Sequence, residues 1–163
     1  MEVTKALSLT EQNIALIGMP GSGKTRVGEN LAQITGREHI DLDHAFEQMV
    51  GASCARAMAR NTFCRSPPES ACRSRSACGG GVVTREENYG LLHQNSRIVM
   101  LNRNIDELAH KGRPITARDG VDKLAQQRMP LYRAWADMVV DSLDCAEATA
   151  REVARRLGEP QAL

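Results

Sequence analysis

Aromatic side chains are scarce in this chain of 163 residues, which contains two Phe, two Tyr and one Trp. Proteins that bind single-stranded nucleic acid without sequence preference stack successive bases on aromatic rings. A chain that is only 3% aromatic offers little surface for such stacking. The composition therefore argues against a base-stacking nucleic-acid platform.

The sequence also lacks an excess of charge of either sign and a long apolar run. Its 21 Lys and Arg residues nearly balance its 20 Asp and Glu residues, which leaves a formal net charge of +1. That balance does not favour a general nucleic-acid or membrane-surface binder. No segment approaches the length of a membrane span, and the stretch MEVTKALSLT at the start holds no signal-peptide core. We expect a cytoplasmic protein with neither nucleic acid nor membrane as a partner.

The five cysteines form no CxxC pair, and their number is odd. Disulfide frameworks use paired cysteines in oxidising compartments, and no export signal accompanies these. We therefore expect reduced thiols. The length is enough for one domain with one sizeable core.

The most informative stretch is GMPGSGKT at residues 18–25, which fits the pattern G-x-x-x-x-G-K-[ST]. The apolar run NIALIG precedes it, as expected of a parallel strand buried on both faces. The segment KTRVGENLAQIT follows, and its Val27, Leu31 and Ile34 recur at helical spacing. A strand, a glycine loop and a helix in this order predict a phosphate cradle.

The chemistry of that cradle depends on its residue types. Glycines let the backbone curl until several N–H groups point at one anion, and the helix N-terminus adds partial positive charge. Lys24 can reach the β- and γ-phosphates of a nucleotide, and the Thr25 hydroxyl can bind Mg²⁺. The predicted nucleotide-binding residues are Gly18, Gly21, Ser22, Gly23, Lys24 and Thr25.

Two carboxylates, Asp41 and Asp43, end a short second predicted strand in REHIDLD. Ligands of parallel sheets bind beyond the carboxyl ends of the strands, so both acids are expected to face the crevice of the glycine loop. Neighbours one residue apart point to opposite faces and should differ in role. One can hold the water shell of a metal, and the other can take a proton from an acceptor hydroxyl. The plainer alternative is an acidic turn with Asp43 as a helix N-cap.

Three further segments extend the pattern: CGGGVVTREEN at 78–88, KGRPIT at 111–116 and QQRMPLYRAWAD at 126–137. Together with GMPGSGKT and DLD, this ordered series resembles shikimate kinase. The matching blocks cover residues 13–50 and 79–142, roughly two thirds of the chain. Each later motif is weak alone, but the ordered set is specific.

The resemblance implies ATP and Mg²⁺ as cofactors and shikimate as the small-molecule substrate. By residue, it implies that Lys24 and Thr25 serve ATP and the metal. Asp41 would act through the waters of the metal. Asp43 would bind the ring hydroxyls of the substrate and orient or deprotonate the attacking one.

The resemblance also implies the remaining substrate contacts. Gly79, Gly80 and Gly81 would contact the substrate through backbone groups, and Arg128 would grip its carboxylate with a guanidinium fork. Arg113 would lie on a short lid near 111–120 and reach the transferring phosphate on closure. From the residues alone, Arg113 and Arg128 could equally be solvated surface arginines.

Residues 52–78 depart strongly from the family pattern. They hold four of the five cysteines and the pair Pro67-Pro68, where the family has an amphipathic helical region. Arg65 is the best candidate for the second carboxylate anchor of the family. The family's apolar strand, interior between the first two, is replaced by ACRSRSAC, which has no Val, Ile or Leu. Burying an unpaired arginine there would be costly, so we expect a frayed, shifted or disordered third strand.

Three explanations of this segment stay open. The first is genuine divergence with a rebuilt site. The second is a zinc or redox role for the cysteines, although their spacings match no common ligand motif. The third is out-of-frame sequence between two compensating shifts. Translation of positions 52–78 in the other frames tests the third, because it requires an apolar strand ending in glycines.

The sequence as a whole predicts a single P-loop kinase domain over residues 1–163, a doubly wound three-layer α/β fold with a degraded third strand. Strands are expected near 13–18, 37–41, 75–78, 97–102 and 137–141, and helices near 24–35, 43–50, 84–94, 104–110, 120–136 and 145–157. We expect a monomeric enzyme that phosphorylates the 3-hydroxyl of shikimate. The alternatives are another small-metabolite P-loop kinase, such as gluconate kinase, and a nucleotide-binding remnant with impaired catalysis.

Overall fold

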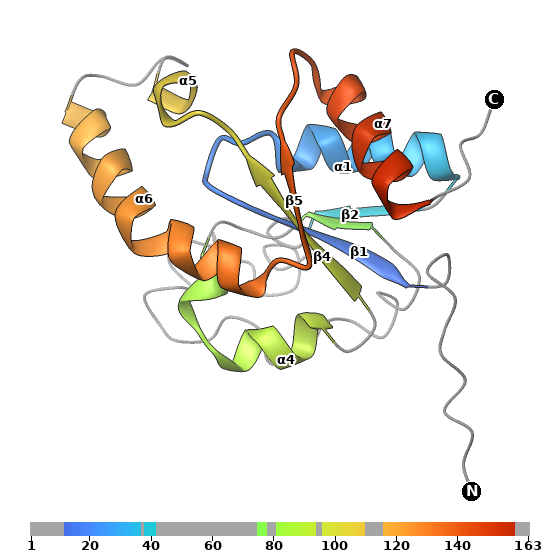
Figure 1. The fold of residues 1–163 in the computed structure, drawn as a ribbon, viewed down its shortest axis with the longest axis horizontal. Helices are drawn as coiled ribbons and strands as arrows, with labels where there is room; N and C mark the ends of the chain where they lie inside the picture. The colour runs from blue at the N-terminus through green and yellow to red at the C-terminus, as the bar shows by residue number, and fades with distance from the viewer. Residues whose placement is uncertain are drawn as a thin grey trace, which may run out of the picture.

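The computed structural model describes residues 12–36, 38–41, 75–77, 81–93, 96–109 and 116–158. Within them, one sheet is formed by β1 (Asn13–Ile17), β2 (His39–Asp41), β3 (Arg75–Ala77), β4 (Ser96–Asn102) and β5 (Met138–Asp141). The strand order is β2-β3-β1-β4-β5, and every hydrogen-bonded pair is parallel (Figure 1). The central strand β1 is buried along its whole length, as its continuous apolar run predicts.

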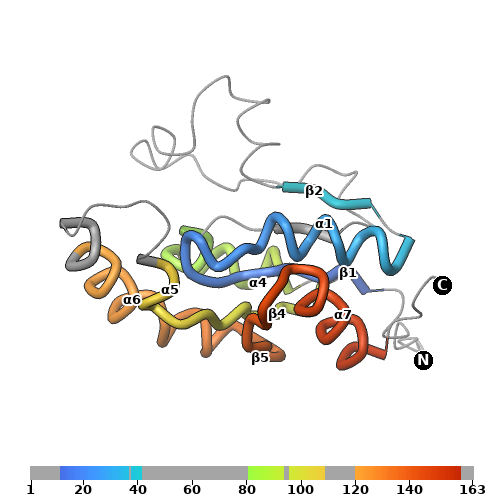
Figure 2. The backbone as a smooth tube through the Cα atoms, turned by 90° about the horizontal axis from the view of Figure 1, so that it is seen from above, coloured from blue at the N-terminus to red at the C-terminus, as the bar shows by residue number. Residues whose placement is uncertain are grey.

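One face of the sheet is covered by α1 (Lys24–Thr35) and α7 (Ala146–Leu157), which lie side by side (Figures 1 and 2). The predicted stripe of α1 is buried in this layer, where it packs with alternate residues of β1 and β4. The buried members are Ile14, Leu16, Val27, Leu31, Ile34, Val99, Leu101, Val140, Ala150, Val153 and Ala154. Each large aliphatic side chain buried here stabilises the fold by about 1.5–3 kcal/mol.

The opposite face is covered by the 3₁₀ helix η3 (Val82–Thr84), α4 (Glu87–His93), α5 (Ile105–Ala109) and α6 (Thr116–Trp135). The remaining alternate residues of β1 and β4 point into this second core. Its buried members are Ala15, Ile17, Met19, Val82, Val83, Ile98, Met100, Leu108, Ala125, Tyr132 and Trp135. Helices on both faces of a parallel sheet confirm the predicted three-layer α/β fold. No helix in the described part of the chain is both long and apolar enough to cross a membrane.

Two helix starts differ from the prediction by more than one residue. The helix expected from residue 84 begins at Glu87, because Thr84 belongs to a 3₁₀ turn whose hydroxyl donates 2.7 Å to the Gly81 carbonyl. The helix expected from residue 120 begins at Thr116, inside the stretch predicted as a lid. A glycine inside a helix costs about 1 kcal/mol relative to alanine, and α6 includes Gly120 despite this cost. The helix predicted at 43–50 lies outside the described residues.

The third strand is present as a three-residue element between β1 and β2. Arg75 is paired with Ile14 of β1 and with His39 of β2, so the backbone holds a parallel register on both sides. The predicted interior position is therefore confirmed, whereas the expected shift or disorder is not seen in Arg75–Ala77, which pair in parallel on both sides. Backbone pairing on two sides explains why a strand forms here without Val, Ile or Leu, because ladder hydrogen bonds need no particular side chain.

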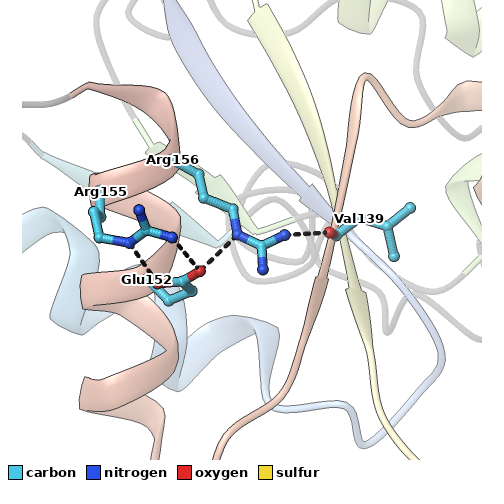
Figure 3. Close-up of polar contacts among 4 residues, drawn as sticks. All are labelled: Val139, Glu152, Arg155 and Arg156. Atoms are coloured by element: carbon cyan, nitrogen blue, oxygen red, sulfur yellow. Dashed lines mark hydrogen bonds and ion pairs between the residues drawn. The ribbon is translucent and has the colours of Figure 1, made fainter.

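Helix α7 is tied to the edge strand β5 by an arginine and glutamate cluster (Figure 3). Glu152 accepts hydrogen bonds from Nε of Arg155 at 2.8 Å and from Nε of Arg156 at 2.6 Å. Arg156 also donates 3.1 Å to the backbone carbonyl of Val139 on β5. These contacts occupy one carbonyl of an edge strand, where unpaired backbone groups invite association with other chains.

Candidate active site

The loop between β1 and α1 has the backbone shape of an anion cradle. Gly21 and Gly23 take φ values of 82° and 87°, in the left-handed region that favours glycine, and Ser22 N–H donates 3.1 Å to the Met19 carbonyl. A Cβ on Gly18 would lie 2.7 Å from the backbone oxygen of Leu101 at the end of β4. The loop is therefore packed directly on the carboxyl end of the neighbouring strand.

Lys24, the first residue of α1, is buried and folded back onto this loop. Its Nζ donates to the carbonyl oxygens of Gly18 at 3.0 Å and Met19 at 2.9 Å, and it lies 3.4 Å from Oγ of Ser22. An ammonium held this way lies against the loop, next to backbone N–H groups and a helix N-terminus. Its charge and theirs favour the same ligand, a bound polyanion.

Thr25 and Asp41, the two predicted metal-binding residues, meet beside the loop. The Thr25 hydroxyl in the first turn of α1 donates 2.9 Å to Oδ2 of Asp41 at the carboxyl end of β2. A hydroxyl and a carboxylate oxygen fit Mg²⁺, which prefers oxygen ligands and keeps several waters. Among the described residues no group of three or more His, Cys, Asp or Glu could hold a metal ion by itself. The donor set therefore fits a metal that a nucleotide helps to hold.

Gly81, at the end of the glycine triplet, is buried at the start of η3. Behind it, Val82 and Val83 enter the same core as Met19 of the loop, and the Asn88 amide donates 2.9 Å to the Val82 carbonyl. This packing holds the end of the glycine triplet against the sheet on the same side as α6.

Arg128 lies on the inner side of α6 rather than on its outer surface. It is partly buried, and residues one turn away on either side, Ala125 and Tyr132, are buried in the core. Its guanidinium forms a side-chain hydrogen bond with Tyr132. Burial raises the pKa of Tyr132 above its ordinary value of 10.0, and the charge and hydrogen bond of Arg128 act against that rise. The phenol and the arginine are therefore neighbours on α6, the helix that packs on η3.

The predicted site residues fall into two groups. Among the described ones, the structure brings together the loop glycines, Ser22, Lys24, Thr25 and Asp41. Gly81 and Arg128 are also described, and they lie on elements that share one core with the loop. The others are Asp43, Arg65, Gly79, Gly80 and Arg113, which lie outside the described residues and stay predictions.

Sequence reasoning missed two features of this region. The Tyr132 partner of Arg128 could have been found from its i, i+4 spacing on a predicted helix. The other is Arg103, which directly follows β4 and whose Nη1 would lie 4.0 Å from a Cβ on Gly23. Its position at the end of a strand beside the loop strand was the available signal.

Comparisons with known proteins agree with this geometry. The family model for shikimate kinase matches residues 20–158. A shikimate kinase of Bordetella avium is 35% identical over 149 residues, covering 79% of this chain and 70% of that protein. Among solved structures, an Acinetobacter baumannii shikimate kinase in complex with shikimate superposes with a TM-score of 0.75 at 24% identity, covering 91% of this chain and 93% of that one. A gluconokinase from Sinorhizobium meliloti superposes with a TM-score of 0.53 at 17% identity, covering 91% and 93%.

Proposed function

The chain belongs to the shikimate kinase family, and from this membership we propose that it transfers the γ-phosphoryl group of ATP to the 3-hydroxyl of shikimate. The observation that carries the chemistry is the Thr25–Asp41 hydrogen bond beside the glycine loop. This bond brings together the two groups suited to Mg²⁺. It places them beside the loop suited to a nucleotide's phosphates, at the carboxyl ends of the strands. The identity of the acceptor rests on the family.

Phosphoryl transfer asks a protein mainly to position groups and to neutralise charge. We assign the triphosphate to the N–H groups of the loop and to Lys24, which would exchange its bonds to the Gly18 and Met19 carbonyls for phosphate oxygens. Thr25 would bind Mg²⁺ directly, and Asp41 would hold its water shell. Bound there, the metal would neutralise charge on the phosphate oxygens.

On the acceptor side, we assign the carboxylate of shikimate to Arg128, which Tyr132 orients from the same face of α6. A guanidinium fork matches a carboxylate in shape and charge. Gly81, with Gly79 and Gly80, would offer backbone groups to the ring, and Arg65 would be the second anchor.

Two further residues would act on the reacting atoms. Asp43 would orient and deprotonate the attacking hydroxyl, and Arg113 would meet the transferring phosphate from the lid. An arginine so placed is worth about 10³-fold or more in rate. A lid also excludes water, which would otherwise compete as the acceptor. We place this reaction in the cytoplasm, in a monomer.

A coupled ADP-release assay with a panel of acceptors tests the proposal. Release that requires shikimate supports it. Release with gluconate and not with shikimate would instead assign the chain to another small-metabolite kinase. ATP binding without acceptor-stimulated release would make the chain a nucleotide-binding remnant.

A further inference from the structure

Arg103 places a second cation at the phosphate loop. It is the first residue after β4, the strand next to β1, and β4 ends against the loop where Leu101 meets Gly18. A Cβ built on Gly23 would lie 4.0 Å from Nη1 of Arg103, so the guanidinium borders the glycine that caps α1. This second positive charge comes from outside the motif GMPGSGKT, whose own cation is Lys24.

A neighbouring carboxylate holds the Arg103 side chain. Nε of Arg103 donates 3.0 Å to Oε2 of Glu107, one turn along α5. The Arg103 side chain is 24% exposed, against 55% for Arg151, which forms the same kind of i, i+4 pair on α7. Among the described residues Glu107 is the only hydrogen-bond partner of Arg103, through Nε, which leaves the two terminal nitrogens for a ligand.

A purely structural role explains this arrangement less well. An ion pair between partly exposed side chains contributes about 0–1 kcal/mol, and Arg151 forms such a pair in open solvent. Arg103 is instead close to Gly23, whose backbone belongs to the anion cradle. The Nζ of Lys24 lies against the same loop, bonded to the Met19 carbonyl. Two cations that converge on one backbone nest favour a ligand with more than one negative charge.

We propose that Arg103 binds a phosphate of the nucleotide, with its terminal nitrogens on phosphate oxygens at the Gly23 side of the loop. This inference rests on the nucleotide half of the proposed function and not on the acceptor. Glu107 acts as a positioning residue that aims the guanidinium. The geometry of a guanidinium suits phosphate in a way that a lysine at this position would not match.

Calorimetric titration of ADP and of adenosine into the full-length chain tests the inference without an acceptor. Arg103→Met should raise the Kd for ADP about 10- to 100-fold, because a charge-assisted contact is lost. Arg103→Lys should raise it less, and Arg151→Met, the matched control on α7, should leave it unchanged. Adenosine affinity should be the same in all four proteins, and thermal melts check that each is folded.

The outcomes separate this inference from the proposed function. An ADP affinity unchanged in Arg103→Met, or equal losses for ADP and adenosine, would overturn the phosphate contact. A wild-type chain that binds no ADP would overturn it as well. A wild-type chain that binds ADP but does not phosphorylate shikimate would refute the proposed reaction and leave the Arg103 result standing.

Discussion

The hydroxyl of Thr25 donates a 2.9 Å hydrogen bond to Oδ2 of Asp41, which joins the first turn of α1 to the carboxyl end of β2. The strand that leads into α1 is β1, and it is not a neighbour of β2 in the sheet, because β3 lies between them. The contact therefore reaches past the end of β3. This contact sets the distance between the Thr25 oxygen, which we assign to magnesium, and the Asp41 carboxylate, which we assign to the water shell of the metal.

Removing the Thr25 hydroxyl should weaken magnesium use without unfolding the protein. Thr25→Val keeps the shape of the side chain but loses the oxygen, and Asp41→Asn loses the carboxylate charge. Each should reduce activity or metal affinity by about 10- to 100-fold, as for other residues that hold or orient a metal. Initial rates measured against free Mg²⁺ check this, with Thr25→Ser as the matched control. Equal magnesium dependence in the Val and Ser variants would contradict the assignment.

Arg128→Ala should raise the KM for shikimate far more than the KM for ATP. The substitution removes a charge-assisted contact to the substrate carboxylate, worth about 1.5–3 kcal/mol. Arg133→Ala is the matched control, because Arg133 lies on the same helix and is exposed. Steady-state kinetics with each substrate varied in turn make the comparison. Equal losses for both substrates would contradict a carboxylate contact.

Arg128→Ala should also raise the pKa of Tyr132 further. Burial already raises that pKa above 10.0, and Arg128 opposes the rise. Since the folded-state pKa is the higher one, the stability linked to this phenol is fully present below the unfolded value and lost as pH rises through the folded value. Phenolate absorbance in a Tyr89→Phe background, which leaves Tyr132 as the one tyrosine, measures the shift. A pKa unchanged by Arg128→Ala would show that the two side chains do not interact in solution.

Glu152→Gln should cost stability at neutral pH and progressively less in acid. Hydrogen bonds from Arg155, then from Arg156, lower the pKa of Glu152 from 4.5 to about 2. A lowered folded-state pKa contributes stability above the unfolded value, and this contribution disappears as pH falls from about 4.5 toward 2. Thermal melts of both proteins across that window should show their Tm values converging. Glu147→Gln, which breaks a single pair with Arg151, is the control. A Tm difference that is constant with pH would contradict the shift.

Residue spacing and strand-end position predicted two features of the structure correctly. The period of Val27, Leu31 and Ile34 placed the buried face of α1, and the strand-end position of Asp41 placed it beside the loop. Helix starts were less accurate, because side-chain bonds to nearby backbone, such as Thr84 to Gly81, redirect a chain over a few residues.

Tertiary placement was the part that local patterns could not supply. The strand-end position of Arg103 was the one signal in the sequence, but it could not place the guanidinium beside Gly23, since that depends on how β4 ends against the loop. The third strand is a second case in which tertiary contacts decided the outcome. Its apolar-poor sequence argued against a strand, yet pairing with β1 and β2 holds its backbone in register.

The most direct test of the proposed reaction is phosphorus NMR of the chain incubated with ATP, Mg²⁺ and shikimate. We expect one new phosphomonoester resonance that grows in step with ADP, and no such growth with Lys24→Ala. ADP accompanied by inorganic phosphate alone, or no ADP at all, would contradict the claim that this site joins ATP to shikimate.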